Sequence, residues 1–118
     1  MLLEKGKAYF ELVFCVPEEG VPEIESYIFI GKNIFNDGDG GDEYYFQTAC
    51  SYYKDGNFAE EKDKLNPQKR AKAEIVLMHE DTIDGLYTME RLIEELKTLF
   101  VNHPSLFGKF QENQGADL

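Results

Sequence analysis

The amino-acid sequence predicts an α+β fold: a mostly antiparallel sheet of four strands, with one long C-terminal helix across one face. Three observations predict it. Apolar residues alternate with polar ones through much of residues 7–50, a run that is apolar on both faces occupies 75–78, and an amphipathic stripe covers 88–102. We expect a three-stranded meander plus a central strand, with a short helix between strands three and four.

The first two strands follow from a period of two. Residues 7–16 alternate aromatic and branched side chains, and their second face also turns apolar after Glu11. Pro17 and Gly20 then interrupt the pattern. Residues 24–34 repeat the alternation, with isoleucines on one face, and so form the second strand.

Residues 35–46, FNDGDGGDEYYF, place two Asp-Gly pairs between two strand-like runs. Glycine after aspartate supplies the positive φ angles of tight hairpin turns, so this stretch is predicted to be a turn. The third strand follows from Glu43 to Cys50. The sequence leaves open whether residues 51–53 continue this strand or begin a helix.

The carboxylates of this turn raise the alternative of a calcium loop. On the EF-hand template, Asp37 and Asp39 fit the first and third ligands. Asp42, however, stands where glycine is required, and Thr48 stands where the closing glutamate belongs. We therefore predict that the turn binds no metal tightly.

The segment between strands three and four contains a predicted capping box. Asn57 is followed by Glu60 three residues later, which indicates a helix over residues 58–65. Residues 73–80 come next and include four consecutive large apolar side chains. A short run that is apolar on both faces is typical of a buried central strand.

The long helix is predicted over residues 88–102, with Thr88 as its N-cap. Its apolar residues recur every three or four positions, which is typical of a helix packed along one side. They are Met89, Leu92, Ile93, Leu96, Leu99 and Phe100. We expect Leu92, Leu96 and Leu99 to be buried, and His103 to cap the last turn as an imidazolium.

By its length, the chain forms one domain over residues 1–110, with a disordered tail over 111–118. One helix covers one face of the sheet, so the second face needs another cover. The candidates are the short helix, the segment that carries Leu106, Phe107 and Phe110, or a second copy of the chain.

The chain carries a formal net charge of −11, with an isoelectric point near 4.5. Such a surface repels nucleic acid and anionic membranes, so neither is an expected partner. No apolar run is long enough to span a membrane and no export signal is evident. Cys15 and Cys50 lie in apolar segments and are predicted to be reduced core residues, which indicates a cytoplasmic protein.

Few residues offer chemistry. The catalytic candidates are His79, at a strand end, with Glu80 or Asp81 to orient it and Cys15 as a nucleophile. No nucleophile motif surrounds Cys15, and neither a zinc-ligand spacing nor a phosphate-binding glycine loop occurs. We therefore expect no enzymatic activity and no cofactor, and keep a small enzyme that uses His79 as the alternative.

The remaining hypothesis is a non-enzymatic domain that binds a protein, most simply one with a basic surface. Carboxylates would speed the encounter, as they do in small inhibitors of the immunity type, and tyrosines would supply the desolvated contact. The predicted contact residues are Asp37, Asp39, Asp42, Glu43, Tyr44 and Tyr45. A homodimer with no charge-steered partner is the second alternative.

Overall fold

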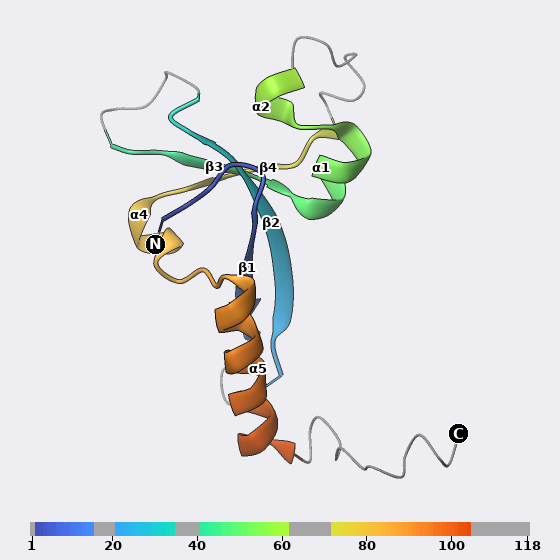
Figure 1. Cartoon of the computed structure of the whole chain (residues 1–118), viewed down its shortest axis with the longest axis vertical. Coiled ribbons are helices and arrows are strands. Elements are labelled where there is room, and N and C mark those ends of the chain that lie inside the picture. The colour runs from blue at the N-terminus through green and yellow to red at the C-terminus, as the bar shows by residue number, and fades with distance from the viewer. Residues whose placement is uncertain (1, 16–20, 35–40, 62–71, 105–118) are drawn as a thin grey trace.

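The computed structural model describes residues 2–15, 21–34, 41–61 and 72–104. Four strands form one antiparallel sheet in the order β1-β2-β3-β4, so the predicted α+β class and four-stranded sheet are confirmed (Figure 1). The strands are β1 (Ala8–Val13), β2 (Glu23–Lys32), β3 (Tyr44–Thr48) and β4 (Ile75–Met78). The segment that carries Leu106, Phe107 and Phe110, and the predicted tail, lie outside the described residues.

β4 forms within the predicted range, but it is an edge strand of the described sheet and not a central one. Among the described strands it pairs only with β3, and the Leu77 side chain is 44% exposed. Val76 and Met78 point to the packed face, because side chains alternate along a strand. An apolar run on both faces therefore did not distinguish a central position from an edge.

Two helices, α1 (Ala49–Asp55) and α2 (Phe58–Glu61), connect β3 to β4. The open question over residues 51–53 is resolved as helix, which Thr48 caps by accepting a hydrogen bond from the Ser51 N–H. The predicted cap of α2 is confirmed, because the side-chain oxygen of Asn57 accepts hydrogen bonds from two backbone N–H groups at 3.0 and 3.3 Å. Residues 62–65 of the predicted helix lie outside the described residues.

A further helix, α4 (Glu80–Ile83), was not predicted and follows β4 directly. The chain then crosses the sheet to its opposite edge, where Tyr87 exchanges two backbone hydrogen bonds with Phe10 of β1 at 2.8 and 2.9 Å. Ile83 and Leu86, on this crossing segment, are buried against the core. The crossing segment therefore covers one face of the sheet.

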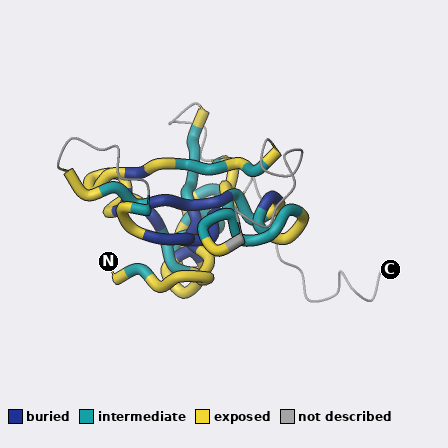
Figure 2. The backbone as a smooth tube through the Cα atoms, turned by 90° about the horizontal axis from the view of Figure 1, so that it is seen from above, coloured by how far each residue is buried: buried dark blue, intermediate teal, exposed yellow. Residues whose placement is uncertain are grey.

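The core of that face is aromatic. Phe46 is fully buried, and its ring lies 5.3 Å from that of Phe29 and 6.2 Å from those of Tyr9 and Tyr27. The tilted and edge-on arrangements are those that aromatic rings prefer. Figure 2 shows the buried residues gathered at the centre of the molecule, with exposed ones around them.

The long helix α5 (Met89–Asn102) has the predicted bounds, and the oxygen of Thr88 accepts a hydrogen bond from the Arg91 N–H at 3.3 Å. The predicted burial is wrong for two of its three leucines, because Leu92 is buried whereas Leu96 and Leu99 are half-buried. α5 contacts β1 and extends beyond the packed centre of the sheet, alongside the β1–β2 hairpin (Figure 1). Within the described residues, no helix is long and apolar enough to cross a membrane.

This difference in burial is testable on neighbouring residues. Leu92→Ala is expected to lower the free energy of unfolding by about 2–3 kcal/mol, because a buried side chain leaves a cavity. Ile93→Ala removes a side chain that is 45% exposed, and we expect it to lower that free energy by less than about 1 kcal/mol. Urea denaturation of both variants measures the difference. Equal losses of unfolding free energy would contradict the finding that Leu92 is buried and Ile93 is not.

Candidate partner-binding surface

The acidic turn is anchored at both ends by Asn33. Its N–H donates to the Glu43 carbonyl at 2.7 Å, and its side-chain oxygen accepts from the Glu43 N–H, also at 2.7 Å. Asn33 has a φ of +53°, a conformation that asparagine tolerates better than most residues. β2 and β3 are antiparallel neighbours, as the hairpin prediction requires. Asp37 and Asp39, two of the predicted contact residues, lie outside the described residues.

Asp42 is not a free carboxylate. It lies 3.2 Å from the Lys32 ammonium and accepts a hydrogen bond from the side-chain amide of Asn33 at 3.2 Å. The hydrogen bond from Asn33, followed by Lys32, holds the pKa of Asp42 below its usual value. The bond to Asp42 likewise raises the pKa of Lys32. This exposed pair reduces the negative charge that Asp42 presents to a partner.

The two tyrosines after the turn differ in accessibility. Tyr45 is only 5% exposed, and its hydroxyl donates to the Glu43 carboxylate at 3.3 Å. Tyr44 is half-buried against the ring of Phe29, and the Lys32 ammonium lies 5.5 Å from its ring centre. Tyr45 therefore has almost no surface to offer a partner, so the predicted aromatic contact falls to Tyr44.

The pairing register separates two of the catalytic candidates, His79 and Cys15. β1 and β4 lie at opposite edges of the sheet. Met78, directly before His79, is level with the end of β2 across the intervening β3, whereas Val13, shortly before Cys15, pairs with the start of β2. β2 has ten residues, so its ends are about 30 Å apart. The strand pairing therefore does not bring Cys15 near His79, and the catalytic alternative loses its candidate nucleophile.

The other catalytic candidates lie together at the start of α4. His79 precedes the helix, and Glu80 and Asp81 form its first turn; all three are exposed. One Asp81 oxygen accepts a hydrogen bond from the Thr82 N–H at 2.9 Å, which is a local helix contact. Within the described ranges, no group of three or more histidine, cysteine or acidic residues is arranged to hold a metal ion.

Both cysteines are exposed and free, so the expectation that they are core residues is wrong. Cys15 comes after the last residue of β1, and Cys50 lies on the outer side of α1. An apolar stretch of sequence predicted their burial, but the sheet covers neither position.

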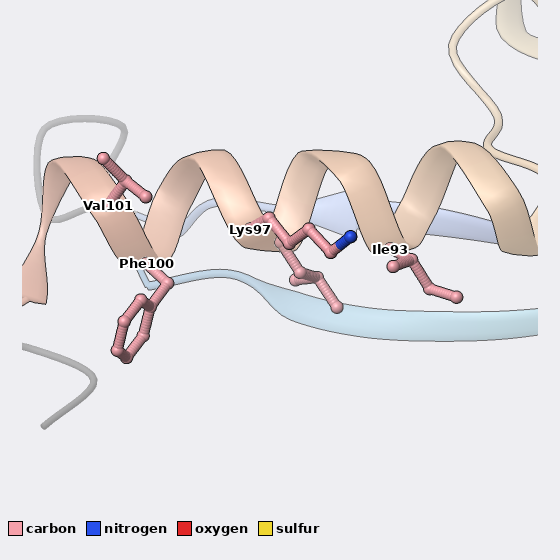
Figure 3. A pocket seen from close by; sticks show the side chains of 5 residues that line it. Ile93, Lys97, Phe100 and Val101 are labelled. Atoms are coloured by element: carbon pink, nitrogen blue, oxygen red, sulfur yellow. The ribbon is translucent and has the colours of Figure 1, made fainter. Parts of the chain in front are cut away.

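α5 carries exposed apolar side chains. A shallow groove of about 510 Å³ is lined there by five residues of this helix, four of them apolar. They are Ile93, Leu96, Lys97, Phe100 and Val101 (Figure 3). Ile93 is 45% and Val101 is 72% exposed. We call this set the α5 face.

Carboxylates lie beside the α5 face. Glu90 and Glu94 are one turn apart and occupy the row next to Ile93, because residues four apart stack on a helix. Glu94 pairs with Lys97 at 3.5 Å, but both side chains are largely exposed, so the pair is weak. Apolar and acidic groups are therefore neighbours along one side of α5.

The β1–β2 hairpin carries a second acidic feature. Glu11 and Glu25 are directly opposite each other in the register, and like charges in such cross-strand pairs destabilise a sheet. The Tyr27 hydroxyl donates to the Glu11 carboxylate at 3.3 Å, and no ion pair within the described part of the chain involves either glutamate. Burial, then the negative charge of Glu11, raises the pKa of Tyr27.

Sequence reasoning found the acidic residues but missed the α5 face. The signal was present, because the apolar positions of residues 88–102 span more of the helix circumference than Leu92 and Leu99 alone. Val101 lies outside that stripe and was the clearest indication.

Comparison with family models, with curated proteins and with solved structures finds no match to this chain.

Proposed function

We propose that this chain is a non-enzymatic domain that binds a protein with a basic surface, and that the α5 face is its contact. The observation that carries the proposal is the exposure of apolar side chains along one helix, next to carboxylates. Contiguous apolar surface rimmed by polar residues often marks a protein-binding site. Ile93 and Phe100 would provide the desolvated part of the contact.

The charge of the chain supports a basic partner. A net charge of −11 attracts a positive surface over several ångströms and raises the rate of encounter. Glu11 and Glu25, opposed on the hairpin, would each gain from a nearby cation. Glu43, next to the predicted turn, would add to this attraction, whereas Asp42 is already paired with Lys32 and Tyr44 carries no charge.

An inhibitor of the immunity type is the specific form of this proposal, because such a protein acts by covering a basic functional surface of its target.

The cytoplasm is the proposed location. Two exposed and free thiols, Cys15 and Cys50, suit a reducing compartment better than an oxidising one.

There are two alternatives to this proposal. A homodimer would bury the α5 face against its copy, and it predicts a doubled mass that Ile93→Gln abolishes. A small enzyme would use His79 with Glu80 or Asp81, without Cys15. Neither Ile93 nor the net charge has a role in that alternative, so variants of Ile93 separate it from the binding proposal.

The test requires an identified partner. The chain is tagged, captured with its partner from the native host, and the partner is purified and titrated against the chain. Ile93→Gln is expected to weaken binding about tenfold, because it places an amide in the desolvated contact. The control Leu77→Gln changes an apolar residue of nearly equal exposure, 44% against 45%, and should leave binding unchanged.

Salt dependence tests the electrostatic half of the proposal. The association rate with the partner is expected to fall steeply as salt rises from low to physiological concentration. A salt-independent association rate would contradict the proposal of a basic partner. Equal binding by Ile93→Gln and by the unchanged chain would contradict the proposal that the α5 face is the contact.

A further inference from the structure

We infer that the partner presents to the α5 face a single amphipathic helix with lysine or arginine beside its apolar stripe. This inference rests on the proposed function and states the form of the bound segment. The α5 face belongs to one straight helix of 14 residues, about 21 Å long. Ile93 and Phe100 extend from the same side of that helix, and Val101 extends from another side (Figure 3).

A helix is the segment that best matches such a stripe. Ile93, Leu96 and Phe100 are spaced by three and four residues, so they form a ridge along the axis of α5. The side-chain ridge of a second helix packs beside a ridge of this kind at 8–10 Å between axes. An amphipathic helix that lies in an apolar groove is a recurrent way for proteins to bind a peptide segment.

The carboxylates beside the stripe select the charge of the bound helix. Glu90 and Glu94 lie along the row next to Ile93, where flanking side chains of the bound helix would meet them. Lys97 already pairs with Glu94, but the pair is exposed and therefore easily exchanged. Lysine or arginine on the bound helix gains from Glu90 directly and from Glu94 by replacing Lys97.

A second copy of the chain fits the α5 face less well. Each copy carries a net charge of −11, and packing two α5 helices together would bring their glutamate rows close. A short basic helix does not have this difficulty.

The test uses a synthetic peptide of about 18 residues, made of leucine and lysine with leucine at helical spacing, so that it is long enough to fold on contact. Its labelled form is titrated with the full chain and followed by fluorescence anisotropy. We expect saturable binding with one peptide per chain. A peptide of the same composition in scrambled order should bind at least about tenfold more weakly, since it has the same charge without the stripe.

Variants locate the bound peptide. Ile93→Gln and Val101→Gln both change exposed residues, so folding is retained, and each is expected to weaken binding about tenfold. Leu77→Gln is the matched control on β4 and should have no effect. Glu90→Gln with Glu94→Gln should weaken binding and reduce its dependence on salt.

Five outcomes would overturn the inference. They are no binding of the ordered peptide, equal binding of the scrambled peptide, no effect of Ile93→Gln, a dimer of the chain that Ile93→Gln dissociates, and peptide binding that appears only after removal of residues 105–118. The last two would assign the α5 face to a second copy or to the chain itself. If binding of the natural partner requires Ile93 but the peptide does not bind, the inference of a bound amphipathic helix is wrong and the proposed function is retained.

Discussion

Replacement of Phe46 by alanine is expected to lower the free energy of unfolding by about 3–5 kcal/mol. Phe46 is fully buried, and its ring contacts those of Tyr9, Tyr27 and Phe29. Truncation removes the buried area and the ring contacts together, and the cavity left in the middle of the sheet cannot collapse without moving three aromatic side chains. Chemical denaturation followed by circular dichroism measures the loss.

Two companion variants give this experiment its controls. Phe46→Leu keeps most of the volume and should cost clearly less than alanine. Tyr53→Ala removes an aromatic side chain that is 76% exposed, and its effect should stay within about 0.5 kcal/mol. If Phe46→Ala cost no more than Tyr53→Ala, the aromatic cluster would not be the core of this fold.

Replacement of Gln47 by methionine is expected to lower the free energy of unfolding by about 2–6 kcal/mol, through lost hydrogen bonds and not through lost volume. Gln47 is fully buried on the opposite face of β3. Its amide nitrogen donates to the Ser51 hydroxyl at 2.9 Å and to the Gly56 carbonyl at 3.0 Å, and its oxygen accepts from the Phe58 N–H at 3.0 Å. Methionine leaves Gly56 and Phe58 without these partners at about 1–3 kcal/mol each.

The variant Gln47→Glu separates hydrogen bonding from packing. A carboxylate keeps the acceptor for Phe58 but faces the Gly56 carbonyl without a proton, so burial should raise the pKa of the new side chain above that of an ordinary glutamate. A group whose pKa is higher in the folded state binds more protons there, so the stability of this variant should fall as pH rises. It should therefore lie closer to the original protein at pH 4 than at pH 7. A pH-independent difference would contradict the proposed network.

Gln47 also shows why part of the fold was not predictable. In the sequence it is one polar residue in an aromatic strand, which would ordinarily face water. In the structure it organises the α1–α2 connection over the second face of the sheet, by binding Ser51, Gly56 and Phe58. These partners are four to eleven residues away, and only the folded connection brings them to one side chain.

The candidate surface was likewise predictable from the sequence only in part. Acidic residues and the total charge were readable from composition, and the apolar stripe of α5 was readable from its spacing. Their accessibility was not, because Tyr45 became buried while Ile93 and Val101 stayed exposed. The exposure of a side chain depends on which distant segment covers it. The periodicity of the sequence gives no information about such contacts.

The sequence alone determined the elements whose causes are local. The first three strands follow from alternation and the fourth from a short, wholly apolar run. α2 and α5 begin where Asn57 and Thr88 can accept hydrogen bonds from N–H groups within a few residues. The tertiary structure alone decided that β4 is an edge strand, that residues 80–87 cross the sheet to pair with β1, and that α5 extends beyond the packed centre. Capping and alternation act over one turn or one residue pair. Edge position and exposure are set by contacts between segments many residues apart.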